Sequence, residues 1–348
     1  MSFRYEMYAY RDIQEAHTDG LLAGNGLSIS YSPRFSYGSL FQAATPFMEE
    51  TVSAIFRALG TTNFELALRE INQAISLNGL VGNASGRLPD LYADIRHALV
   101  RVVQQVHPEK TDIDTPAGAQ AAEGRRHGRL AELGVQLARF KAIFTTSYDL
   151  IPYWAIMTAP SSFKDYFFDC LFSSEVPEKY LERIPLHFLH GALHLYTEDK
   201  RTRKIVAESR HLTLPRTLDQ LYRSGDAVPL FVSEGLSRHK MSRILENEYL
   251  SFCYDSLKRQ SGGLTVFGLS FDGDEHIVQA VRESALRRIA IGIYTPGMSP
   301  EAIMLEQARY AGKFGSDREL VFFDSATFGG GGRGSRRRRL RAPPASSK

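Results

Sequence analysis

Short apolar segments alternate with helical stretches along most of this chain, and this alternation constrains the fold more than any other feature. Each apolar segment is only a few residues long, as expected of a strand that is buried on both faces. Strands that are joined by helices build a largely parallel sheet covered on both faces, so the sequence predicts the α/β class. The expected strands are residues 20–24, 141–146, 184–189, 229–232, 264–267, 288–293 and 319–323, and the clearest helices between them are 237–257, 275–287 and 300–313.

An inserted helical subdomain is expected at about residues 46–135. Apolar side chains recur there every three or four residues, which is the period of a helix that buries one face. Gly60 is placed to end the first of these helices, and the polar segment 107–127 after the third is expected to be a mobile loop. The apolar positions are Met48, Val52, Ile55 and Leu59, then Phe64, Leu68, Ile71 and Ile75, then Leu91, Ile95, Leu99 and Val102.

The positive charge of the chain is concentrated at its carboxyl end. Residues 329–348 contain seven basic side chains and no acid, so the formal charge of +3 falls to −4 for residues 1–328. A mildly acidic body gives no reason to expect nucleic-acid binding, except through this tail. Because the tail is rich in glycine and arginine and cannot bury a core, we expect it to be disordered.

Cysteine content and the distribution of apolar residues bear on the compartment. Cys170 and Cys253 are the only cysteines in the sequence, too few for a four-cysteine zinc site or a framework of disulfides. Residues 1–16 lack the apolar core of a signal peptide, and no uncharged run approaches the roughly 20 residues that cross a bilayer. The sequence therefore predicts a cytoplasmic protein with no membrane partner.

Small, polar and titratable residues follow four of the expected strands, at the edge where parallel sheets bind ligands. The first segment is residues 24–28 (Gly-Asn-Gly-Leu-Ser), whose glycines would let the backbone approach a diphosphate. The second is Thr145 to Asp149, whose hydroxyls and carboxylate could grip a ribose and an amide. The third is His190-Gly191, where the imidazole could take a proton from a ribose hydroxyl or a water. The fourth is Gly268-Leu269-Ser270.

Each segment also has a plain structural explanation. Glycine turns are common after strands. Threonine and serine at a strand end can satisfy backbone groups while Asp149 caps the next helix, and His190 can be a packed, hydrogen-bonded histidine. A metal site formed by His187, His190 and His194 is rejected, because on a strand these positions do not converge and no H-E-x-x-H pattern is present.

Taken in order, the four segments resemble the motif series of the sirtuin-like superfamily of NAD-consuming proteins, and more closely an uncharacterised bacterial branch of it. The similarity spans roughly residues 18–325. It departs from the family at Ser147, where the Thr-Thr-Asn-Tyr-Asp motif has an asparagine. The resemblance implies a Rossmann-like parallel sheet flanked by helices, forming one NAD-binding domain over residues 1–328.

The resemblance also implies roles for individual residues. The histidine of the third segment would be the general base, and the second segment would face the nicotinamide end of NAD. The implied catalytic residues are His190, Ser147 and Asp149, and the implied NAD-binding residues are Gly24, Asn25, Gly26, Ser28, Thr145, Thr146, Gly268 and Ser270.

The reaction that the resemblance implies is hydrolysis of NAD to nicotinamide and ADP-ribose, as in antiphage effectors of this family. Lysine deacylation fits less well, because the zinc module of protein deacylases needs four thiolates, so we expect NAD as the ligand and no zinc. Two alternatives stay open: a sensor that binds NAD or ADP-ribose without turnover, and an interaction protein with a relict pocket. A homo-oligomer or an activating protein partner would suit either an effector or a sensor.

A second copy of the nicotinamide motif is suggested by residues 61–65 (Thr-Thr-Asn-Phe-Glu), which retain the asparagine. No apolar strand precedes this copy. We therefore expect Thr62 and Glu65 to form a capping box for the helix that follows, with no role in a site.

Overall fold

The computed structural model describes residues 6–114, 128–206, 214–215, 217–218, 229–232, 236–315 and 317–329. Residues 330–348 of the tail for which disorder is predicted lie outside the described residues, as do residues 115–127 of the predicted mobile loop. The described start of that predicted loop contains a short helix, α6 (Lys110–Asp114).

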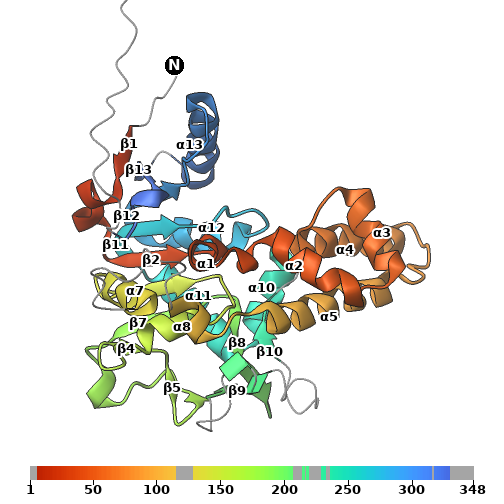
Figure 1. Cartoon of the computed structure of the whole chain (residues 1–348), viewed down its shortest axis with the longest axis horizontal. Coiled ribbons are helices and arrows are strands. Elements are labelled where there is room, and N and C mark those ends of the chain that lie inside the picture. The colour runs from red at the N-terminus through yellow and green to blue at the C-terminus, as the bar shows by residue number, and fades with distance from the viewer. Residues whose placement is uncertain are drawn as a thin grey trace, which may run out of the picture.

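An eight-stranded parallel sheet forms the centre of the fold (Figure 1). Its strand order is β1-β13-β12-β11-β2-β3-β7-β4, and each pairing between neighbours is parallel. The predicted α/β class is therefore confirmed. The strands are β1 (Met7–Ala9), β2 (Gly20–Ala23), β3 (Ile143–Thr145), β4 (Phe163–Lys164), β7 (Ile184–Phe188), β11 (Ser261–Phe267), β12 (Ala285–Ile293) and β13 (Glu319–Asp324).

Strands are added to this sheet in two directions, starting from β2 in the middle. From β2 the chain passes to β3 and β7 on one side, and it later returns to β11 and continues outward through β12 and β13. The order β7-β3-β2-β11-β12-β13 is the 3-2-1-4-5-6 order of a Rossmann fold. In such sheets ligands bind beyond the carboxyl ends of the strands where the winding reverses, which here are β2 and β11.

The central strands are apolar because both of their faces are covered. All residues of β2 and β3 are buried, and so are the last five of β11. The covering helices include α1 (Asn25–Tyr31), α7 (Arg129–Leu137), α8 (Ile151–Ile156), α10 (Ser237–Glu246), α11 (Glu248–Lys258), α12 (Glu275–Glu283) and α13 (Pro300–Phe314). Short 3-10 turns occupy Tyr10–Asp12, Gln14–His17, Pro33–Phe35, Thr45–Phe47, Glu178–Tyr180 and Ser325–Thr327.

A helical lobe separates β2 from β3 in the sequence and projects to one side of the sheet (Figure 1). It consists of α2 (Tyr37–Ala44), α3 (Glu50–Leu59), α4 (Phe64–Leu80) and α5 (Leu88–Val106). The helices bury most of the side chains that the period predicted, among them Phe64 and Leu68 of α4 and Leu99 of α5, whereas Leu59 at the end of α3 is 37% exposed. Gly60 ends α3 in the left-handed conformation, with φ of 61°. Among the described residues, no helix has the length and apolar character that a bilayer span requires.

A second, five-stranded antiparallel sheet was not anticipated from the sequence. Residues 229–232 were expected to join the parallel sheet, but β10 (Pro229–Phe231) pairs antiparallel with β8 (Gly191–Glu198) instead. The chain turns at Leu189 and His190 between β7 and β8, and Gly191, the first residue of β8, has a φ of 76° that suits glycine. The other strands are β9 (Arg201–Lys204), β6 (Leu171–Phe172) and β5 (Phe167–Phe168), the last two too short to show an alternating pattern.

Two backbone turns meet where the winding of the large sheet reverses. The amide of Gly26, at the start of α1, donates a 2.9 Å hydrogen bond to the carbonyl of Gly268, at the end of β11. A Cβ atom on Gly268 would lie 2.6 Å from the Cα of Gly26, and a Cβ on Gly24 would lie 2.4 Å from the carbonyl oxygen of Gly268. The three glycines are therefore required by the close approach of the two turns.

We expect Gly268→Ala to lower the free energy of unfolding by about 2–4 kcal/mol, because the new methyl group overlaps backbone atoms and φ is 65°. Urea unfolding followed by circular dichroism measures the change. Gly79→Ala is the matched control, since nothing lies within 4 Å of its Cβ position in α4. The control should raise stability by about 0.5 kcal/mol through helix propensity. Equal effects of the two substitutions would contradict the tight approach.

Candidate functional site

A cavity of about 1010 Å³ lies along the carboxyl edge of the parallel sheet. Many of its lining residues directly follow or end β3, β2, β11, β12 and β13, and others come from α1, α7 and α13, so the cavity occupies the crevice where the winding reverses. The lobe contributes Glu65 from the first turn of α4. Small-molecule and cofactor sites typically have volumes of about 300–1,000 Å³, so this one is large enough for a dinucleotide.

The four sequence segments meet at this cavity, but not with all their residues. Two residues that were expected to bind NAD, Gly24 and Thr145, lie beneath the lining, and so does the expected catalytic residue Asp149. Ser28 is fully buried in α1, and its hydroxyl has no partner among the described residues. The expected site residues that do line the cavity are Asn25, Gly26, Thr146, Ser147, His190, Gly268 and Ser270.

The segment after β3 is organised by hydrogen bonds within itself. The backbone amide of Ser147 donates to the hydroxyl of Thr145 at 3.0 Å, and the hydroxyl of Ser147 donates to Asp149. Asp149 also accepts a 2.8 Å hydrogen bond from the amide of Ile151, the first residue of α8. The carboxylate of Asp149, 2% exposed, thus supports the start of the helix.

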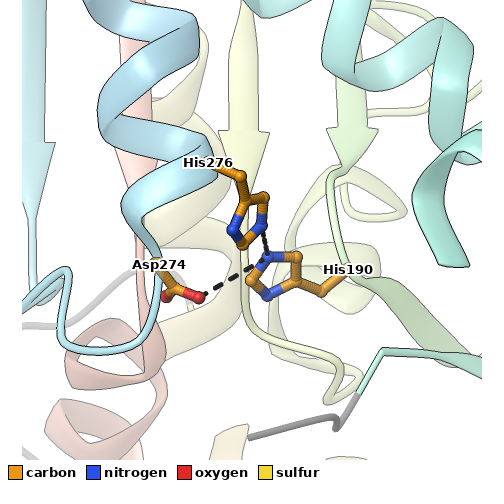
Figure 2. Close-up of side chains that lie close together, drawn as sticks. All are labelled: His190, Asp274 and His276. Carbon is orange, nitrogen blue, oxygen red and sulfur yellow. Dashed lines mark hydrogen bonds and ion pairs between the residues drawn. The ribbon is translucent and has the colours of Figure 1, made fainter. Parts of the chain in front are cut away.

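Three titratable side chains lie close together beside the cavity (Figure 2), and two of them, His190 and Asp274, line it. His190 lies in the turn between β7 and β8, while Asp274 and His276 come from the start of α12. The Nε2 atoms of His190 and His276 are 2.9 Å apart, and Nε2 of His190 is 3.8 Å from Oδ1 of Asp274. Nδ1 of His276 lies 2.9 Å from the hydroxyl of Ser237 in α10.

A buried lysine connects this group to the helical lobe. Nζ of Lys240 donates hydrogen bonds of 2.8 Å to Oδ1 of Asp274 and to Oε2 of Glu65. The side chain of Lys240 is only 1% exposed. One ammonium between two carboxylates leaves this side of the cavity with a net charge of −1.

The capping box that was expected at Thr62 and Glu65 is wrong. Asn63 caps α4 instead, accepting hydrogen bonds from the backbone amides of Glu65 at 2.9 Å and Leu66 at 3.4 Å. Since the cap is one residue later than expected, the side chain of Glu65 is free to reach the cavity and Lys240. Residues 61–65 therefore do contribute to the site.

Burial sets the direction of the pKa shift of the two histidines, and neighbouring charges set it for Lys240 and Asp274. Burial lowers the pKa of His190 to about 3, although Asp274 favours its charged form. Burial also lowers the pKa of His276 to about 4. For Lys240, burial opposes the charged form, but Glu65 and Asp274 outweigh it and raise the pKa above its ordinary value. Burial would raise the pKa of Asp274, but Lys240 and then the two histidines lower it.

His190, Asp274 and His276 include the residue types that bind divalent metals, and their ligand atoms all lie within 4.8 Å of one another. Two ligand atoms of one ion, each at about 2.0–2.2 Å, are at most about 4.4 Å apart, and the distances of 2.9 Å and 3.8 Å from Nε2 of His190 are within that limit. Lys240, however, places an ammonium on the same Oδ1 atom of Asp274. The arrangement as it stands is therefore that of a hydrogen-bonded group.

The other two histidines of the rejected metal pattern face different surroundings. His187 stacks on Phe144 with 4.7 Å between ring centroids, and His194 stacks on Tyr153 with 4.4 Å. Both are core residues, so His190 is the only one of the three that reaches the cavity.

We expect Lys240→Met to lower the free energy of unfolding by about 3–5 kcal/mol, because it leaves the buried Asp274 and the partly buried Glu65 without their cation. Denaturant unfolding at pH 7 measures the loss. Lys258→Met is the matched control, since Lys258 pairs with Glu283 on the surface and its removal should not change stability measurably. A Lys240 variant as stable as this control would contradict the buried ion pair.

We also expect the protein to lose stability as the pH falls from 6.5 to 4. The ordinary histidine pKa is 6.5, so below it the unfolded chain binds protons that folded His190 and His276 do not. The lowered pKa of Asp274 acts in the same direction, at lower pH. Each buried histidine should contribute about 1.4 kcal/mol per pH unit. Urea unfolding at pH 7 and at pH 4.5 gives the difference in the free energy of unfolding between the two pH values. This difference should be smaller in His276→Gln than in the wild-type protein. It should equal the wild-type value in His97→Gln, because His97 is exposed on the surface of α5.

A known family matches residues 21–330, which contain the parallel sheet from β2 to β13, the lobe and the cavity. No curated protein matches the sequence. The matching family is described as a domain of unknown function, DUF4917, and the chain belongs to it.

Proposed function

We propose that this protein binds NAD in the cavity at the carboxyl edge of its sheet and hydrolyses it to nicotinamide and ADP-ribose. The observation that carries the proposal is the convergence of Ser147, His190 and the turns at Gly26 and Gly268 on one large cavity. These residues come from four separate strand ends, and the winding of the sheet brings them together.

In this proposal the nicotinamide end of NAD lies beside Thr146, Ser147 and His190, and the diphosphate passes Gly26 and Gly268. The adenosine then extends toward Ser270 and the ends of β12 and β13. Glycine turns without side chains suit the diphosphate, because their backbone can come close to it. All the residues assigned to these contacts line the cavity.

Cleavage of the bond between nicotinamide and ribose develops positive charge on the ribose. The net negative charge of Glu65, Asp274 and Lys240 would stabilise that charge, more strongly in a buried site than in water. His190 is neutral at pH 7, because burial lowers its pKa to about 3. A neutral imidazole can accept the proton of the attacking water.

A sensor that binds NAD or ADP-ribose without turnover is the second candidate. Ser147 favours this candidate, because its hydroxyl donates its hydrogen bond to Asp149. A serine also lacks the side-chain amide that the asparagine of the sirtuin-like motif has at this position. The low pKa of His190 also makes it a weak base in the absence of assistance.

The test is to incubate the purified protein with NAD and to quantify nicotinamide and ADP-ribose by chromatography. We expect release of both products, a loss of about 10²-fold or more in His190→Ala, and full activity in His97→Ala, whose side chain is exposed on the lobe. Calorimetric titration with ADP-ribose measures binding separately. Binding without product would favour the sensor, and the absence of both would refute the proposal.

Ser147→Asn tests the departure from the family motif. An asparagine amide could donate to Asp149 and still present its carbonyl to the cavity, so we expect kcat to rise by about 10-fold. Chromatography of the products gives kcat. A lower kcat in the variant would contradict the prediction, because it would show that the reaction depends on the hydroxyl of Ser147.

A further inference from the structure

A continuous chain of hydrogen bonds leads from the cavity to the first residue of α10, and Figure 2 shows its first step, between His190 and His276. His190 lines the cavity and contacts His276 through the Nε2 atoms at 2.9 Å. His276 in turn contacts the hydroxyl of Ser237 through Nδ1 at 2.9 Å. Ser237 is half-buried, so the chain ends near solvent.

The backbone holds this chain in place. The hydroxyl of Ser237 accepts a 2.8 Å hydrogen bond from the amide of His276, which fixes the serine against the first turn of α12. The hydroxyl of Tyr254 donates to the carbonyl of His276 at 3.1 Å. The imidazole of His276 is thus fixed by its neighbours at both ends, as in a residue that orients another group.

The hydrolysis of NAD releases one proton, which must be transferred from the cavity to solvent. Among the described residues, the ring of His190 makes its one hydrogen bond to His276, so its Nδ1 atom remains available to the cavity. If Nε2 of His190 carries the hydrogen and donates it to His276, Nδ1 is the basic atom. His276 then carries its own hydrogen on Nδ1 and donates it to Ser237.

We propose that His276 and Ser237 form a relay that moves the proton accepted by His190 out of the cavity. This inference rests on the proposed hydrolysis of NAD. Water oxygen bonds to the ribose carbon, the bond to nicotinamide breaks with its electron pair on the nicotinamide nitrogen, and one water proton passes to Nδ1 of His190. The Nε2 proton of His190 then passes to His276, the Nδ1 proton of His276 passes to Ser237, and the serine proton leaves to solvent.

The surrounding charges suit a transient positive charge on the two rings. Asp274 lies 3.8 Å from Nε2 of His190 and is held there by Lys240, which Glu65 holds in turn. The carboxylate is too far away to take the proton and close enough to stabilise the imidazolium. His276 and Ser237 touch no substrate in this scheme, so both are positioning residues.

The kinetic test uses His276→Gln, whose amide can hydrogen-bond to His190 but cannot take up its proton. We expect kcat for NAD hydrolysis to fall by about 10–100-fold with KM changed by less than about 3-fold, and the acid limb of the pH profile to move. Ser237→Ala should lower kcat by a smaller factor and Ser237→Thr should restore it. An unchanged kcat in His276→Gln, or an effect on KM alone, would overturn the relay.

Ring nitrogen NMR on protein labelled with ¹⁵N-histidine tests the hydrogen-bond chain without any turnover. We expect His190 to be neutral with its hydrogen on Nε2, and to lose this preference in His276→Ala. A hydrogen on Nδ1 of His190 would overturn the relay. So would a Co²⁺ absorption band in the wild-type protein that His276→Ala removes, because it would make the group a metal site. If the wild-type protein does not cleave NAD, the proposed function fails, and the NMR result still decides whether the chain exists.

Discussion

The ammonium group of Lys240 ties together three parts of the molecule that are far apart in the sequence. It holds Glu65 at the start of α4 in the lobe and Asp274 at the start of α12 beside the sheet, and it belongs itself to α10. Burying an ammonium is costly, and this one is compensated by two carboxylates at hydrogen-bond distance. Because removal of Lys240 would leave both carboxylates without their cation, the position of the lobe against the cavity depends on this contact.

The same contact sets the electrostatics of the cavity. Two carboxylates and one ammonium leave a net negative charge beside the neutral pair His190 and His276. In a buried site such a charge acts over short distances with little screening. A substrate that carries or develops positive charge is therefore favoured there over a second anion. The glycine turns and helix start at the middle of the cavity offer the complementary environment to a diphosphate.

The sequence predicted the parallel sheet and the lobe because both leave a local pattern. Strands buried on two faces are continuous apolar runs, such as β2, and the lobe helices repeat apolar residues with the helical period. The antiparallel sheet was missed because β5 and β6 have two residues each. The polar group formed by Glu65, His190, Lys240, Asp274 and His276 was largely missed, because its contacts join residues that are 175, 86 and 34 positions apart in the sequence. His276 was not among the predicted site residues, although it lies eight positions after Gly268 in the chain.

The glycine motif shows why the polar group carries more functional information than the sequence segments do. Gly24, Gly26 and Gly268 resemble a nucleotide-binding pattern, yet each is already required by the approach of two backbone turns. A protein that bound nothing would still need them. The packing of the fold does not in the same way require that His276 contacts the cavity-lining His190 and that Ser237 contacts His276. A buried chain of polar groups lowers stability unless every member is satisfied, so its presence at a ligand crevice points to chemistry.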